Sequence, residues 1–187
     1  MKRSKKATLL LMAPITATLI LTGCAEEPVV DALVFKNPEE CAASSTLSPE
    51  QCKTDYEKAK KLSSNVAPKY ANKTECETDF GVGKCETAPA QTGGSSFFMP
   101  MMMGYMMGKM FNNQAGTMNT NSAFAPQPLY KSRNDSSTFR TATNSPVSRQ
   151  TGLVPIRASQ TQPKAASMTR RGGFGAQAAS RSMFSGG

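Results

Sequence analysis

The sequence predicts a small α-helical, disulfide-stapled head, a short Met-rich helix and a largely disordered C-terminal tail. Three observations predict this architecture: three helix-start signals that each precede a cysteine, seven methionines within fifteen residues, and a long final segment that is poor in apolar side chains. The predicted division is a signal peptide at 1–23, a linker at 24–36, the head at 37–92, the Met-rich segment at 93–111 and the tail at 112–187.

The first segment reads as an export signal. Four basic residues precede an apolar run from Ala7 to Leu21, which is shorter than the ~20 residues that a membrane-spanning helix needs. Leu21-Thr22-Gly23-Cys24 resembles the lipobox of bacterial lipoproteins, which implies cleavage before Cys24 and acylation of that residue. Two or more acyl chains anchor a protein stably.

The residue after Cys24 predicts which membrane holds the protein. It is Ala25 rather than aspartate, so inner-membrane retention is not signalled. By analogy with enterobacterial sorting, we expect the periplasmic side of the outer membrane.

Composition argues against catalysis. Histidine is absent, which removes Ser-His-Asp and Cys-His pairs and the commonest metal ligand. Acidic residues crowd the expected helix starts, where capping and the helix dipole account for them. We therefore expect no enzymatic activity and no cofactor.

Charge divides the exported chain into two halves. Residues 24–92 carry eight Lys/Arg and twelve Asp/Glu, a net charge of −4. Residues 93–187 carry ten Lys/Arg and one acid, a net charge of +9.

A repeated capping pattern predicts three short helices in the head. Asn37, Ser48 and Asn72 each precede a Glu or Gln at the third following position, and a cysteine comes next. This spacing is a capping box, so we expect a helix to begin at each of the three. The second helix should bury one face, formed by Cys52, Tyr56, Ala59 and Leu62.

An even set of cysteines predicts two disulfides in an exported chain. The spacings match neither the short knuckles of zinc sites nor a CxxC redox motif, so we expect structural bonds among Cys41, Cys52, Cys76 and Cys85. Three pairings are open. A weak repeat, Phe35-x-Asn37-x-x-Glu40-Cys41 against Tyr70-x-Asn72-x-x-Glu75-Cys76, favours Cys41–Cys52 with Cys76–Cys85.

The Met-rich segment FFMPMMMGYMMGKMF predicts a contact helix. Flexible, polarizable methionines suit apolar contact with an envelope protein, a second copy, the head or lipid. Gly104 and Gly108 have the spacing that lets helices approach closely. The predicted stripe is Met99, Met103, Met106, Met107 and Met110, with Tyr105 beside it. The alternative is a periplasmic Cu(I) site, in which Met103, Met106, Met107 and Met110 supply soft sulfur ligands.

The composition of the tail predicts disorder, because more than half of its residues are Ser, Thr, Asn, Gln, Gly or Pro. Its basic residues include Arg170, Arg171 and Arg181. They suit an electrostatic contact with anionic lipid or polysaccharide, and a solvated spacer is the alternative. Export argues against a nucleic-acid partner for the RRGGFG sequence.

A set of short motifs resembles one known family. In order they are Ala67-Pro-Lys-Tyr70, Glu75-Cys76, Phe80-Gly-x-Gly-x-Cys85, Ala88-Pro-Ala-Gln91, Met99-Pro100, Gly104-Tyr-Met-Met-Gly108 and Arg171-Gly-Gly-Phe-Gly175. Together they resemble the YgiB-type family of uncharacterised gammaproteobacterial proteins. The resemblance implies an envelope lipoprotein with no assigned activity.

Overall fold

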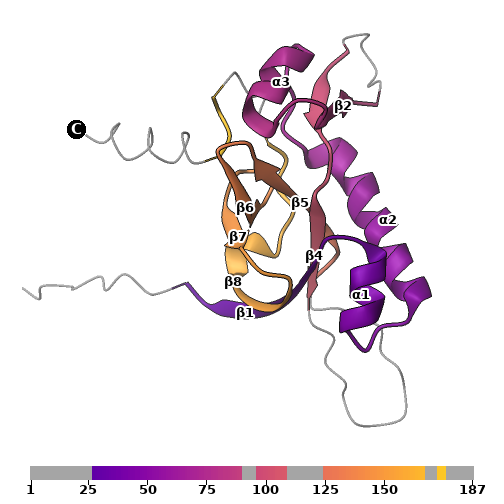
Figure 1. The fold of residues 1–187 in the computed structure, drawn as a ribbon. Coiled ribbons are helices and arrows are strands. Elements are labelled where there is room, and N and C mark those ends of the chain that lie inside the picture. The colour runs from indigo at the N-terminus through magenta and orange to yellow at the C-terminus, as the bar shows by residue number, and fades with distance from the viewer. Residues whose placement is uncertain (1–26, 90–95, 109–123, 167–171, 176–187) are drawn as a thin grey trace, which may run out of the picture.

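β-Strands make up most of the fold, so the predicted small α-helical head is wrong. The computed structural model describes residues 27–89, 96–108, 124–166 and 172–175. Within these ranges, six strands form one antiparallel sheet in the order β7-β6-β5-β4-β1-β8, and two more form a small hairpin. The sheet curves into a nearly closed, barrel-like shape (Figure 1).

The strands of the large sheet come from distant parts of the chain. They are β1 (Val29–Phe35), β4 (Gly104–Gly108), β5 (Gln127–Ser132), β6 (Asp135–Arg140), β7 (Pro146–Ser148) and β8 (Gly152–Arg157), and the 3₁₀-helix η1 (Ala158–Gln160) follows β8. β1 lies between β4 and β8, so the first strand of the chain pairs directly with the last.

Both edges of the sheet carry a proline, Pro146 in β7 and Pro155 in β8. Proline cannot donate a backbone hydrogen bond, which protects an edge strand from pairing with another chain. Gln160, just after β8, donates its side-chain amide to the carbonyl of Pro146 at 2.8 Å. This bond ties together the segments at the two edges.

Alternate residues of the strands face opposite sides of the sheet. One side holds a core cluster that includes Val34, Met106, Leu129, Phe139 and Ile156. On the other side, Phe35, Tyr105 and Met107 pack against Cys41, Cys52 and Ala59 of the helices.

The three predicted helices are confirmed as α1 (Pro38–Ser44), α2 (Pro49–Val66) and α3 (Lys73–Phe80). Each cap side chain accepts a hydrogen bond from the backbone N–H three residues on, at 2.8 Å for Asn37, 3.2 Å for Ser48 and 2.9 Å for Asn72. α3 ends at Phe80, and the next residue is Gly81, whose φ of +105° a glycine adopts without strain.

A third core cluster joins α3 to the rest of the fold. It contains Tyr70, Phe80, Tyr130 and Phe174, together with Met99 of the hairpin formed by β2 (Cys85–Thr87) and β3 (Phe98–Pro100). α3 and β2 lie at the opposite end of the molecule from β1 (Figure 1).

The predicted disorder of the tail is wrong for residues 124–166, which supply β5 to β8 and η1. β8 needs few apolar residues because only one of its faces is buried. In β8, Val154 and Ile156 are buried, whereas Leu153, Pro155 and Arg157 are exposed. The amino-acid composition of the segment does not reveal this alternation of buried and exposed residues.

Candidate functional site

The predicted Met-rich helix is wrong, because its described residues, which end at Gly108, lie in β3, in β4 and between them. Met106 and Met107 are both fully buried, but adjacent residues of a strand point to opposite faces. Met106 therefore lies in the core cluster that contains Val34 and Leu129. Met107 lies in the cluster under α1 and α2, and Met99 lies in the cluster around α3.

This distribution separates the methionines that were predicted to act together. Met103 is half-buried between β3 and β4, and its backbone N–H donates to the carbonyl of Leu129 at 2.8 Å. Met110 lies outside the described residues. The copper-ligand prediction needs sulfur atoms that converge, and Met106 and Met107 do not share a face.

The two glycines of the segment belong to β4 and are buried. A Cβ atom on Gly104 would lie 2.7 Å from the carbonyl oxygen of Phe35 and 2.8 Å from the ring of Phe139. Gly104 thus permits close packing inside the sheet, whereas the sequence suggested an approach between helices. Tyr105 is buried as well, and Gly108 pairs in register with Ala32.

The disulfides form within each half of the weak repeat, as Cys41–Cys52 and Cys76–Cys85. All four cysteines are buried. Cys41–Cys52 joins the first turns of α1 and α2, and Cys76–Cys85 joins α3 to β2. Each bond therefore holds a short element onto its neighbour.

The RGGFG motif of the tail contains a docked segment, residues 172–175. Phe174 is buried against Phe80, with ring centroids 4.7 Å apart, and also meets the Tyr130 ring edge-on. The N–H of Gly172 donates to Oδ1 of Asp79 at 2.8 Å. Arg170, Arg171 and Arg181 lie outside the described residues, so the predicted contact of the tail with anionic lipid or polysaccharide stays a prediction.

Asp79 is a buried carboxylate that no sequence signal singled out. Its Oδ2 accepts a hydrogen bond from the hydroxyl of Tyr70 at 2.9 Å, and its backbone carbonyl accepts one from the N–H of Arg133 at 2.7 Å. Asp79 of α3 therefore contacts the β5–β6 turn through its backbone carbonyl and the docked segment through its side chain. Its role is structural.

A second polar network surrounds Arg140, whose guanidinium donates to Asp135 Oδ2 at 3.0 Å and to the side chain and backbone carbonyl of Asn144. Hydrogen bonds from Ser137, Thr138 and Arg140 hold the pKa of Asp135 well below its ordinary range. Among the residues that the structure describes, Nε of Arg140 is the one buried side-chain polar atom without a hydrogen-bond partner.

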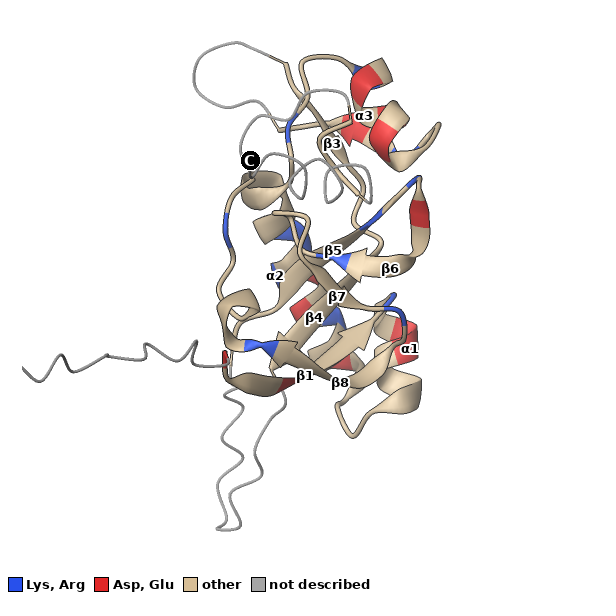
Figure 2. Ribbon diagram, turned by 90° about the vertical axis from the view of Figure 1, so that its left-hand side faces the viewer, with Lys and Arg blue, Asp and Glu red and all other residues tan. Residues whose placement is uncertain are grey.

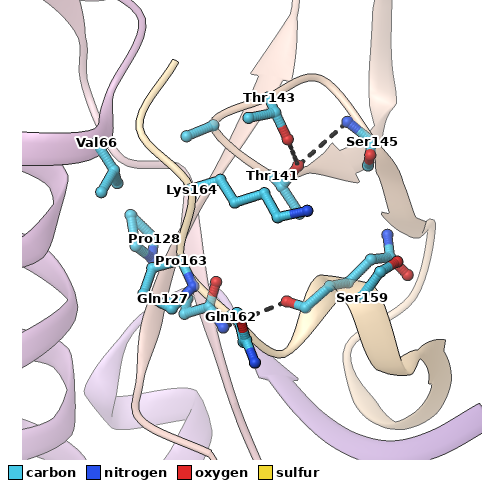
Figure 3. A pocket seen from close by; sticks show the side chains of 12 residues that line it. Val66, Gln127, Pro128, Thr141, Thr143, Ser145, Ser159, Gln162, Pro163 and Lys164 are labelled. Carbon is cyan, nitrogen blue, oxygen red and sulfur yellow. Dashed lines mark hydrogen bonds between the residues drawn. The ribbon is translucent and has the colours of Figure 1, made fainter.

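A small polar cavity of about 70 Å³ lies between α2, the turn after β6 and the segment after η1. Figure 3 shows Lys164 extending across it toward Thr141. The Thr141 hydroxyl bonds the Thr143 hydroxyl and accepts from the N–H of Ser145. The cavity has room for about two water molecules, at ~30 Å³ each, and is well below the ~300 Å³ of a typical ligand pocket.

A larger depression, with a volume of about 600 Å³, lies open to solvent between α1 and α2. Its lining mixes exposed charged side chains with half-buried Ala42 and Tyr56. Tyr56 packs edge-on against the buried ring of Tyr105, at 5.7 Å between centroids. This packing explains why a polar aromatic residue lies on the inner face of α2.

The start of β1 is tied to η1. Oε1 of Glu27 accepts a hydrogen bond from the N–H of Ser159 at 2.6 Å, and the carbonyl of Pro28 accepts one from the N–H of Ala158 at 2.9 Å. The bonds from Ser159 lower the pKa of Glu27, and the charges of Arg157 and Lys164 act in the same direction. Cys24 lies outside the described residues.

In the described ranges, no group of three or more Asp, Glu, Cys or His side chains is arranged to hold a metal ion. Within the same ranges, each helix is too short or too polar to cross a membrane.

Residues 29–185 match the model of a family described as "Protein of unknown function (DUF1190)". This match fits the uncharacterised YgiB-type family that the sequence motifs resemble and confirms that prediction. No solved structure matches the chain.

Proposed function

We propose that this chain, which belongs to the DUF1190 family, is a non-enzymatic lipoprotein of the bacterial cell envelope. In this proposal Cys24 is acylated and holds the domain on the periplasmic side of the outer membrane. The disulfide-bonded domain then follows its anchor closely, because β1 begins at Val29, five positions after Cys24.

The observation that carries the proposal is the pair of buried disulfides. Disulfides persist in oxidising compartments such as the bacterial periplasm and are rare in the cytosol. The lipobox-like sequence that ends at Cys24 supports export independently of the fold.

The side chains with shifted pKa values support a non-enzymatic role. Burial raises the pKa of Tyr105 and of Tyr130, and each hydroxyl has a structural partner, the carbonyl of Cys52 at 3.4 Å and the hydroxyl of Ser63 at 2.8 Å. Burial lowers the pKa of Lys131, whose ammonium lies 4.0 Å from the ring centroid of Phe139. Active sites gather such groups in a cleft, whereas here each serves a separate contact.

The proposal does not include a partner contact through Met106 and Met107, because both are fully buried. The burial of these side chains in separate clusters accounts for the methionines as core-filling residues, a role that their flexibility suits.

Cell fractionation of a Cys24→Ala variant tests the anchor. We expect the wild-type protein in the outer-membrane fraction and the variant released from it. An Ala25→Asp variant is the matched control, because it keeps the acylated cysteine and should move to the inner-membrane fraction. Retention of Cys24→Ala in the outer membrane would contradict the proposal.

A further inference from the structure

The methionines that the structure describes differ in how far solvent reaches them. Met99, Met106 and Met107 are 5 %, 0 % and 0 % exposed. The three consecutive methionines at 101–103, which connect β3 to β4, are half-buried. An oxidant dissolved in water therefore reaches this connection before it reaches the methionines of the core.

The backbone of the connection is held at both of its ends. The N–H of Met101 donates to the carbonyl of Lys84 at 2.9 Å, and the N–H of Met103 donates to the carbonyl of Leu129 at 2.8 Å. These two bonds extend the pairing of β2 with β3 and the pairing of β4 with β5. The partial exposure of the three side chains is thus a fixed feature of the fold.

The three side chains differ in their contacts with the core. Met102 packs against the cluster under α1 and α2, which includes the Cys41–Cys52 disulfide. In the part of the chain that the structure describes, Met101 and Met103 are packed against none of the three core clusters. A polar group on the sulfur of Met102 would therefore disturb apolar packing, whereas the same change at Met101 or Met103 would not.

Thioether sulfur is the sulfur that this domain offers to an oxidant. The four cysteines in the described ranges already form disulfides, and in the proposed function the sulfur of Cys24 carries lipid. Residues 96–108, which include β3 and β4, contain no charged side chain (Figure 2). No lysine amine within this stretch therefore competes with the methionines for the oxidant.

We propose that Met101, Met102 and Met103 form a site of methionine oxidation, and that oxidation of Met102 weakens the packing of α1 and α2 against the sheet. In the net reaction with hypochlorous acid, the sulfur gains one oxygen atom and gives up two electrons. The O–Cl bond breaks, and chlorine leaves as chloride together with one proton. The methionine sulfoxide that results is polar and disrupts apolar packing.

Limited oxidation of the full-length protein, purified from cells and treated with substoichiometric hypochlorous acid, tests the site. After reduction of the disulfides, one tryptic peptide, residues 85–109, contains all six described methionines, so tandem mass spectrometry compares them within one peptide. We expect oxygen on residues 101–103 before it appears on Met99, Met106 or Met107. Protein unfolded in urea is the matched control, in which all six should oxidise alike.

A uniform pattern in the folded protein, or oxidation that begins at Met99, Met106 or Met107, overturns the inference. Either result leaves the proposed lipid anchor intact, because the oxidation is measured on the folded domain and does not depend on acylation.

Leucine variants isolate the effect of Met102, because leucine preserves side-chain volume and cannot take up the oxygen. After the same oxidation, the urea midpoint of wild type and of the control Met101→Leu should fall by at least about 0.5 M, the shift that one poorly placed polar group causes in a small protein. Met102→Leu should keep its midpoint. Methionines outside the described ranges are the same in all three proteins, so their oxidation does not affect the comparison. An equal fall in Met102→Leu, or no fall in wild type, overturns the role of Met102.

Discussion

Two hydrogen bonds join Asn144 to Gly175. The N–H of Gly175 donates to Oδ1 of Asn144 at 2.9 Å, and Nδ2 of Asn144 donates to the carbonyl of Gly175 at 3.2 Å. Asn144 has a φ of +67°, a conformation that asparagine tolerates better than most residues. The amide side chain thus imitates a backbone partner and secures residues 172–175 against the turn after β6.

A Gly175→Ala substitution should loosen this segment. The new Cβ would lie 2.5 Å from Oγ of Ser132, and the φ of Gly175 is +88°, so both contact and backbone conformation oppose it. We expect a loss of about 1–3 kcal/mol in the free energy of unfolding, measured by urea denaturation. Gly173→Ala is the control, because Gly173 is exposed and does not have a positive φ. Equal stability of the two variants would contradict the docking of Gly175.

Phe174→Ala should be more costly than either glycine change. The side chain is buried between Phe80 and Tyr130, and removing a buried aromatic ring costs about 3–5 kcal/mol. Thermal unfolding followed by circular dichroism measures the loss, and Phe174→Leu should retain part of the stability. A Phe174→Ala protein with wild-type stability would show that the segment is not part of the folded core.

Sequence patterns predict the local features of this fold well. The caps at Asn37, Ser48 and Asn72 predict three helices that the structure contains, because a cap and its partner lie within three residues. The weak repeat also favours the disulfide pairing that is present. In both halves, an aromatic residue two positions before the cap, Phe35 or Tyr70, is fully buried.

Long-range pairing is what the sequence does not reveal. β1 precedes the first helix, yet it pairs with β4 and with β8. β8 begins more than a hundred residues after β1 ends. Short apolar runs fit a helix or a strand equally well, so periodicity does not decide the structure of the Met-rich segment. The partner strands decide it: β4 pairs with β1, which lies in the predicted linker, and with β5, which lies in the segment that composition assigns to disorder.

Met106 and Met107 lie in separate apolar clusters, so we expect leucine to replace either of them at little cost. Each Met→Leu change preserves side-chain volume and should cost less than about 1.5 kcal/mol, whereas Met→Ser in either core should cost more. Urea denaturation of the four single variants measures the difference. Equal losses for leucine and serine would indicate that sulfur itself is required, as a copper site demands.

Asp135 should make stability depend on acidic pH. Its pKa in the folded protein is lowered, so its contribution is present above the ordinary value of about 3.9 and is lost as pH falls below it. We expect Asp135→Asn to unfold at lower urea concentration than wild type at pH 6, with the difference shrinking at pH 2.5. A difference that is constant with pH would exclude the ionised Asp135–Arg140 pair as its source.

The central claim, an acylated and disulfide-bonded envelope protein, is tested most directly by intact mass. The full-length protein is extracted from cell membranes and alkylated with and without prior reduction. We predict a chain that begins at Cys24, carries acyl groups and gains four alkyl groups only after reduction. An unacylated mass, or four cysteines alkylated without reduction, would contradict the account.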